Sequence, residues 1–118
     1  MKIIITSKGK TLDSDVDPRF GRGAYFLLID ADSKEFEVLD NSEGIAASHG
    51  AGVQAGQRVV NSGATALITG HVGPKAGQAM AGSDVKIYSH AEGTVREMLN
   101  KFLAGELKPD TTEEGQQS

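Results

Sequence analysis

The sequence predicts a single α/β domain with a five-stranded mixed sheet and three helices. Three apolar segments near the amino terminus are typical of consecutive strands, and the rest of the chain alternates in the order helix, strand, helix, strand, helix. With 118 residues and 38% hydrophobic content, the chain is long enough for one modest core. Connections through helices make the last two strands parallel, with right-handed crossovers.

The first three strands form the amino-terminal part of the predicted sheet. Residues 2–7 contain three consecutive isoleucines, which suits a strand buried on both faces. Residues 24–30 form the second strand, and residues 35–39 form the third, in which Phe36 and Val38 alternate with two glutamates. The short turn between the second and third strands makes them an antiparallel hairpin.

The first helix is predicted from Val53, Gly56 and Val60, which fall at helical spacing, and it ends at the stop signal of residues 61–63. Residues 64–69 are typical of a buried strand, so this helix is the crossover into the parallel part of the sheet.

The second helix begins at Gly73 and Pro74, since proline at a first-turn position costs little. Ala76 and Met80 share one face of this helix, and residues 85–88 form the last strand. The two segments complete the predicted sheet.

The third helix has the clearest local signal in the chain. Thr94 and Glu97 have the spacing of a capping box. The apolar residues that follow have the i, i+3, i+4, i+7, i+8 pattern of a helix on a sheet: Val95, Met98, Leu99, Phe102 and Leu103. We therefore expect a domain over residues 1–105, followed by a polar tail over residues 106–118 that has almost nothing to bury and is disordered.

Composition excludes several classes of function. The net charge is −4 and no basic face is present, which argues against a nucleic-acid partner. The chain has no cysteine, so it cannot hold zinc or an iron–sulfur cluster by thiolates. No apolar run approaches membrane-spanning length and the amino terminus lacks a signal pattern, so we expect a cytoplasmic protein without a membrane partner.

A loop with two arginines is the first candidate for a binding site. The segment Asp17-Pro18-Arg19-Phe20-Gly21-Arg22-Gly23 places two guanidinium groups and an aromatic ring ahead of the second strand. Arginine forks suit a multiply charged anion, and Phe20 would contact a soft or flat part of it. In the alternative, Arg19 and Arg22 pair with Asp13, Asp15 or Asp17, and Phe20 belongs to the core.

The predicted topology brings the histidines to the same edge as this loop. If the fourth strand pairs parallel to the first, then the first, third, fourth and fifth strands all end at one edge. His49, His71 and His90 follow the third, fourth and fifth strands. Ligands of open α/β sheets bind at such edges, so all three histidines of the chain would face one crevice.

Gly50, Gly52 and Ala55 occupy the small positions of a dinucleotide-binding fingerprint before a helix. The acid that this fingerprint requires after the next strand is missing, since residues 69–71 are Thr-Gly-His. Backbone donors at a positive helix end could still receive an anion. Alternatively, Gly52, Ala55 and Gly56 only let the helix sit close on the sheet.

Five segments in order resemble the dinitrogenase iron–molybdenum cofactor biosynthesis family, over about residues 1–107. They are Met1-Lys2-Ile3, Asp17 to Arg22 before Tyr25-Phe26, His49 to Ala55, Gly73 to Ala76, and Ala91 to Glu97. The resemblance implies a ribonuclease-H-like fold with strand order 3-2-1-4-5. It also implies binding of an anionic metal–sulfur cofactor or precursor, as in NifX-like carriers and the related orange-protein type with its molybdenum–copper sulfide cluster.

The residues that the resemblance assigns to the site are Arg19, Phe20, Gly21 and Arg22, then His49 to Gly52, and then Gly70 to Gly73. Our leading hypothesis is a non-enzymatic carrier that holds a preassembled cluster of molybdenum with iron or copper, without covalent cysteine bonds. Its two arginines would neutralise the cluster, Phe20 would shield it, and the backbone of Gly50 and Gly52 would contact its sulfides. The three histidines are candidates to ligate an edge metal.

Two other classes of function are alternatives to the carrier. A ribonuclease-H-like nuclease needs carboxylates on the first and fourth strands, but residues 3–6 are Ile-Ile-Ile-Thr and residues 66–69 are Ala-Leu-Ile-Thr, so the sequence argues against this class. An interaction or regulatory module would instead bind a protein, such as a cluster-assembly protein or an ATPase of cluster delivery.

Overall fold

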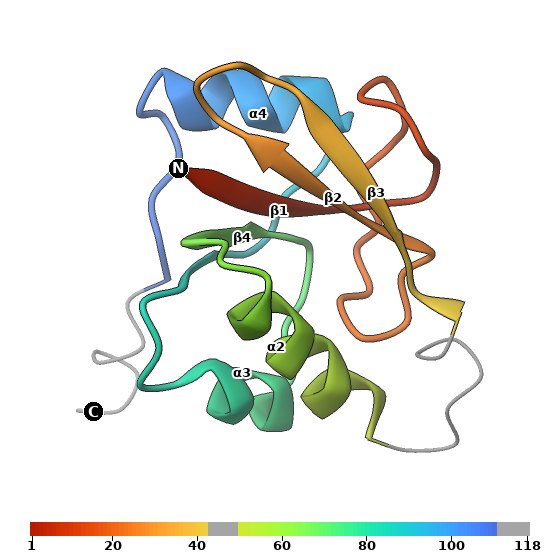
Figure 1. Ribbon diagram of the computed structural model, residues 1–118, viewed down its shortest axis with the longest axis vertical. Helices are drawn as coiled ribbons and strands as arrows, with labels where there is room; N and C mark the ends of the chain where they lie inside the picture. The colour runs from red at the N-terminus through yellow and green to blue at the C-terminus, as the bar shows by residue number, and fades with distance from the viewer. Residues whose placement is uncertain (43–49, 111–118) are drawn as a thin grey trace.

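A computed structural model describes residues 1–42 and 50–110 (Figure 1). Its strands are β1 (Lys2–Ser7), β2 (Tyr25–Asp30), β3 (Phe36–Asp40), β4 (Ala66–Ile68) and β5 (Lys86–Tyr88). The helices within these ranges are α2 (Ala51–Asn61), α3 (Pro74–Met80) and α4 (Val95–Leu103), and none of them is long and apolar enough to cross a membrane. All the predicted strands and helices are present, with ends shifted by a few residues at most.

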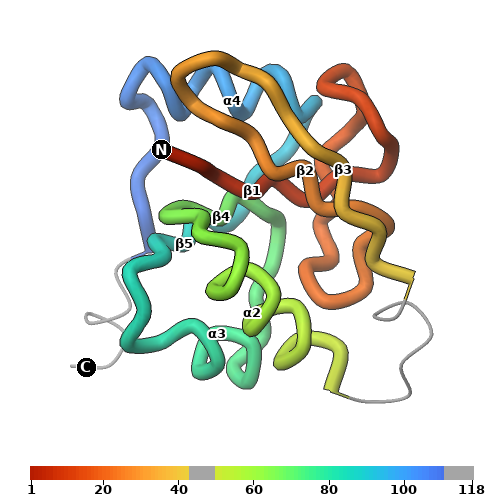
Figure 2. Tube along the Cα trace, in the orientation of Figure 1, coloured from red at the N-terminus to blue at the C-terminus, as the bar shows by residue number. Residues whose placement is uncertain are grey.

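The five strands form one mixed sheet in the order β3-β2-β1-β4-β5, which confirms the predicted fold class. β1 lies in the centre, antiparallel to β2 and parallel to β4, and β5 is parallel to β4. The β2–β3 hairpin is antiparallel, as expected from its short turn. In Figure 2 these strands lie between α4 on one side and α2 with α3 on the other.

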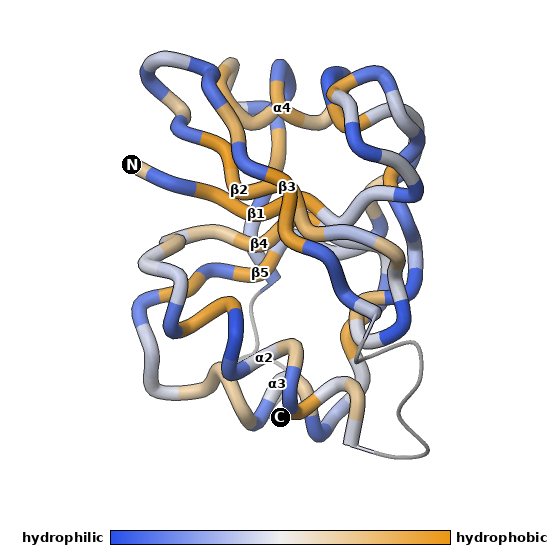
Figure 3. The backbone as a smooth tube through the Cα atoms, turned by 45° about the vertical axis from the view of Figure 1, so that its right-hand side comes forward, coloured by the Kyte–Doolittle hydropathy of each residue, from blue (hydrophilic) through white to orange (hydrophobic). Residues whose placement is uncertain are grey.

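β1 supplies the core on both faces of the sheet. Ile3 and Ile5 pack with Val95 and Leu99 of α4, whereas Ile4 packs on the opposite face with residues of α2 and α3. All three isoleucines are fully buried, and the apolar character of the strands is visible in Figure 3. The isoleucine run is thus explained by a strand that is covered on both sides.

The predicted capping box of α4 is present. Thr94 Oγ1 accepts a hydrogen bond from the backbone N–H of Glu97 at 3.1 Å, and the Glu97 carboxylate accepts one from the N–H of Thr94 at 2.8 Å. Phe102 packs edge-on against Tyr88, with ring centroids 5.4 Å apart. The prediction is wrong for Leu103, which is 40% exposed, whereas its neighbour Phe102 packs against the core.

Helices α2 and α3 pack closely through glycine. A Cβ on Gly52 would lie 3.2 Å from Cβ of Ala76, and a Cβ on Gly56 would lie 3.0 Å from Cβ of Ala79. These glycines therefore admit the neighbouring helix, whereas the alternative above expected contact with the sheet. The buried face of α2 also differs from the predicted stripe, since Val59 is fully buried and Val53 only partly.

The first residues of the predicted tail make specific contacts. Leu107 packs against the core cluster on the α4 side of the sheet. The backbone N–H of Asp110 donates to Ile87 O at 2.6 Å, and its carboxylate accepts from the Ser89 hydroxyl at 2.8 Å. Over residues 106–110 the structure thus differs from a contact-free tail. Residues 111–118 lie outside the described ranges, and the domain boundary at residue 105 stays a prediction.

The close packing of α2 on α3 can be tested with two glycine substitutions. We expect Gly56→Leu to lower the free energy of unfolding by about 1–3 kcal/mol, because the new side chain must displace α3. Gly77→Ala is the matched control, since a Cβ there meets nothing within 4 Å, and it should stabilise by about 0.4–1 kcal/mol. Urea denaturation measures both, and a neutral Gly56→Leu would contradict the packing.

Candidate functional site

The carboxyl ends of β1, β3, β4 and β5 lie at one edge of the sheet, as predicted from the topology. The loop with the two arginines reaches this edge after β1. Arg19 forms an isolated parallel bridge with His71, which follows β4, and the N–H of His71 donates to Pro18 O at 2.9 Å. The loops that follow β1 and β4 are therefore paired with each other.

A buried carboxylate organises the arginine loop. Asp17 is fully buried, and its Oδ1 accepts the backbone N–H of Arg19 at 3.0 Å, while its Oδ2 accepts the N–H of Ala24 at 3.3 Å. The backbone of Asp17 is fixed as well, because Thr6 Oγ1 donates to its carbonyl oxygen at 2.7 Å and its N–H donates to Thr6 O. Both the backbone and the side chain of Asp17 thus hold the loop in place through hydrogen bonds.

The side chain of Arg19 completes the coordination of this carboxylate. Its Nε donates to Asp17 Oδ1 at 3.1 Å and its Nη2 to Oδ2 at 3.2 Å. Burial raises the pKa of Asp17, but the hydrogen bonds from the Arg19 side chain and from the two backbone N–H groups, with the charge of Arg19, outweigh burial and lower that pKa below its usual value. The carboxyl group therefore stays ionised at neutral pH.

Arg19 remains available for a ligand despite this pairing. Its side chain is 65% exposed, and only two of the five N–H groups of a guanidinium are directed at Asp17. Arg22, three residues further along the loop, is also exposed. The pairing anticipated in the alternative thus exists for Arg19, but it orients the guanidinium without covering it.

Phe20 belongs to the core, as the alternative expected. It is 2% exposed and stacks on Phe26, with ring centroids 6.0 Å apart and planes inclined by 21°. In this position its ring anchors the loop to the α2 side of the sheet. Contact of the ring with a ligand at the surface would require Phe20 to leave the core.

Gly21 brings the loop against the start of α2. A Cβ on Gly21 would lie 2.8 Å from the backbone nitrogen of Gly52 and 3.0 Å from the carbonyl carbon of Ala51. Gly50, the N-cap residue of α2, has φ of 79° and is exposed. The predicted residues Gly21, Gly50 and Gly52 are thus neighbours, at the positive end of a helix with no acidic residue in its first turn.

The loop after β4 also lies close against the arginine loop, at Gly70 and Pro18. A Cβ on Gly70 would lie 2.5 Å from Cα of Pro18, so only glycine fits there. The N–H of His90 donates to Gly70 O at 2.8 Å, which joins the loop after β5 to the same edge. Gly73 lies further along as the N-cap residue of α3.

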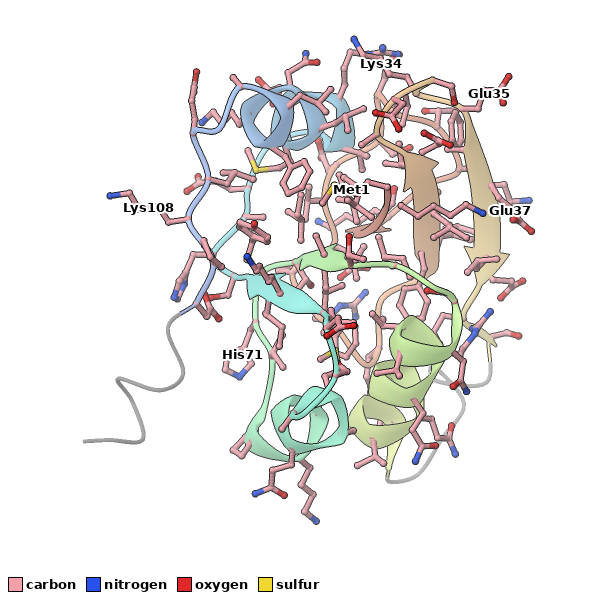
Figure 4. All side chains as sticks on the ribbon, turned by 60° about the vertical axis from the view of Figure 1, so that its left-hand side comes forward. Met1, Lys34, Glu35, Glu37, His71 and Lys108 are labelled. Atoms are coloured by element: carbon pink, nitrogen blue, oxygen red, sulfur yellow. The ribbon has the colours of Figure 1, made fainter. Side chains whose placement is uncertain are left out.

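The histidines are placed at this edge only in part. His71 and His90 are exposed, with His71 visible at the surface near α3 in Figure 4, and His90 has φ of 64°, unusual for a residue with a side chain. His49 lies outside the described residues. Within residues 1–42 and 50–110, no three His, Cys, Asp or Glu side chains are close enough to hold a metal ion.

Sequence reasoning missed Asn41, which is 3% exposed at the end of β3. Its Nδ2 donates to the carbonyl oxygens of Gly23 at 2.8 Å and Gly21 at 3.1 Å, and its backbone N–H donates to Ala24 O. A polar residue directly after a strand was the only signal available. Asn41 holds the second half of the arginine loop.

Residues 1–105 match the family described as dinitrogenase iron–molybdenum cofactor. The chain belongs to this family. The match covers the whole sheet and all three described helices.

Solved structures agree with membership in the dinitrogenase iron–molybdenum cofactor family. The apo form of the orange protein from Desulfovibrio gigas is 43% identical, with a TM-score of 0.89 over 93% of this chain and 92% of that one. A Thermotoga protein solved by NMR is 37% identical, with a TM-score of 0.77 over 92% and 91%. Among relatives by sequence alone, an uncharacterized protein of Methanocaldococcus jannaschii is 26% identical over 95 residues, 79% of this chain and 80% of its own.

The role of Asp17 predicts a pH-dependent stability. We expect Asp17→Asn to lower the free energy of unfolding at pH 7 by about 1–3 kcal/mol. The amide NH₂ group replaces one of the two oxygens that accept hydrogen bonds, so an N–H group of the loop loses its acceptor. Loss of the ion pair itself costs little, because Arg19 remains in contact with water. The pKa of Asp17 is lowered on folding, so its stabilisation is complete above the ordinary value of about 3.9 and is lost as the pH falls through the folded pKa.

Urea denaturation of both proteins between pH 7 and pH 3 measures this effect. The difference in stability should stay constant down to about pH 5 and shrink below pH 4. Asp15→Asn removes the same charge from an exposed position of the same loop and should change stability by less than about 0.5 kcal/mol. A difference that persists undiminished at pH 3 would contradict the proposed ionisation.

Proposed function

We propose that this protein is a non-enzymatic carrier of a preassembled, anionic metal–sulfur cluster that contains molybdenum with iron or copper and is held non-covalently. The observation that supports this proposal is the orientation of Arg19. Its guanidinium is fixed by the buried Asp17 yet 65% exposed, on a loop packed against the start of α2. Membership in the dinitrogenase iron–molybdenum cofactor family, and the likeness to the orange protein, support the choice of ligand.

Charge and hydrogen bonds would hold the cluster in place of thiolates. The chain has no cysteine to form metal–sulfur bonds. The three N–H groups of Arg19 that are not directed at Asp17, together with Arg22, would donate to the sulfides and neutralise the cluster. The backbone at Gly50 and Gly52 adds the positive end of α2.

We propose histidine as the ligand of a metal at the edge of the cluster. His71 and His90 follow adjacent parallel strands and are exposed, and His49 follows β3 in the sequence. Neutral imidazole suits copper and iron, which would let these side chains complete an open coordination position. Gly70, which admits the backbone of Pro18, and Gly73, where a Cβ would meet nothing within 4 Å, flank His71, and the backbone at Gly73 is open to the ligand.

As a carrier, the protein would receive its cluster from an assembly protein and deliver it to another protein, an ATPase of cluster delivery being one candidate. We further propose that it acts in the cytoplasm. The cluster itself is what the protein carries, and it would bind at the carboxyl ends of the strands, beside the arginine loop.

Arginine substitutions test this function directly. Purified protein is incubated anaerobically with tetrathiomolybdate and copper(I), desalted, and analysed for both metals and for visible absorbance. We expect the unmodified protein to retain molybdenum and copper, and Arg19→Ala with Arg22→Ala to bind at least tenfold more weakly, since a hydrogen bond to a charged group contributes about 1.5–3 kcal/mol.

Arg96→Ala is the matched control for this experiment. Arg96 is an exposed arginine that also pairs with an aspartate, Asp13 at 2.8 Å, but it belongs to α4 on the other face of the sheet. It should retain as much metal as the unmodified protein. If anaerobic protein from its native host and the reconstituted protein both hold no metal, the carrier proposal fails, and a copurifying metal-free partner would favour an interaction module.

A further inference from the structure

The two outermost strands of the sheet, β3 and β5, differ in how their outer sides are covered. The outer edge of β5 is occupied by the chain itself, because the N–H of Asp110 donates to Ile87 O and Ser89 binds the Asp110 carboxylate. At the other edge, β3 has β2 as its only neighbouring strand among the described residues. An open strand edge offers main-chain donors and acceptors to another chain.

The hydrogen-bond register identifies which groups of β3 are open. The N–H of Asp30 donates to Glu35 O, and the N–H of Asn41 donates to Ala24 O. Since hydrogen-bonded pairs alternate along an antiparallel ladder, residues 35, 37, 39 and 41 bond to β2. The N–H and C=O groups of Phe36 and Val38 therefore point outward, and no backbone hydrogen bond within residues 1–42 and 50–110 satisfies them.

The side chains along this edge alternate between apolar and acidic. Val38 packs partly on the α4 side of the sheet, and Phe36, two residues earlier, lies on the same side and is 39% exposed. Glu35 and Glu37 lie on the other side, and Figure 4 shows both carboxylates pointing away from the sheet. Neither carboxylate forms an ion pair or hydrogen bond in the part of the chain that the structure describes.

The charge of the hairpin selects the kind of partner. Residues 30–40 contain five carboxylates and one lysine, a net charge of −4, equal to that of the whole chain. A second copy of β3 would place like charges across the new ladder, which is unfavourable. A strand in which lysine or arginine alternates with apolar residues would match both faces of β3.

We propose that the open edge of β3 is a docking site for a basic, extended segment of a partner protein, which adds a sixth strand to the sheet. The main chain of Phe36 and Val38 forms the new ladder, Glu35 and Glu37 pair with the basic side chains, and the exposed Phe36 ring contacts the apolar ones. This site is separate from the arginine loop and does not depend on what that loop binds.

The probe for this site is the capped peptide Lys-Val-Lys-Val-Lys-Val, titrated into the full ¹⁵N-labelled protein and followed by NMR. We expect saturable shifts of the amide signals of Phe36 and Val38, and none with Glu-Val-Glu-Val-Glu-Val. Glu35→Gln with Glu37→Gln should weaken binding roughly fivefold, as expected for two exposed ion pairs. Glu92→Gln with Glu106→Gln, an equal charge change at exposed positions elsewhere, should leave binding unchanged.

Proline substitutions test the register. Phe36→Pro removes an outward N–H at the first residue of an edge strand, so the protein should fold and bind the peptide at least tenfold more weakly. Glu37→Pro removes a bond to β2 and should destabilise the fold instead. Undiminished binding by folded Phe36→Pro, or peptide shifts confined to other residues, would overturn the proposal. Concentration-dependent shifts of Phe36 and Val38 without peptide would overturn it in favour of a second copy.

Discussion

The candidate site depends on the burial of the Asp17 carboxylate. A charge removed from water must be paired and hydrogen-bonded, or the fold loses several kcal/mol. Here the donors are the Arg19 guanidinium and the backbone N–H groups of Arg19 and Ala24, all from the same loop. Satisfying one buried carboxylate thus closes the loop and orients the arginine in a single step, before any ligand is present.

The backbone around Asp17 makes this arrangement rigid. Gly21 and Gly70 let the loop touch the start of α2 and the loop after β4 at distances that a side chain would not permit. Asn41 ties the far half of the loop to β3. Three segments that are distant in the sequence are therefore joined by direct contacts, and an anion held there would meet donors that need little reordering on binding.

The fold could be predicted from the sequence because its signals are local. The isoleucine run, the short hairpin turn and the Thr94–Glu97 capping box each act within a few residues, while the strand order came from the family resemblance. The ion pairs were not predictable, since Asp13, Asp15 and Asp17 are all near Arg19 in the chain. In the structure Asp17 pairs with Arg19, whereas Asp13 pairs with Arg96, 83 residues away. Burial of Phe20 likewise depended on long-range packing.

An acidic protein can bind an anion at this edge because its charges are separated. The turn of the β2–β3 hairpin lies at the opposite end of β2 from the arginine loop, and six residues of strand span roughly 20 Å. At physiological ionic strength, exposed charges more than about 8 Å apart are largely screened from each other, so most of the hairpin's carboxylates contribute little at Arg19. Asp17 is close, but its charge is compensated by the loop itself. The local field at the loop, and not the net charge of −4, therefore decides which ligands can bind there.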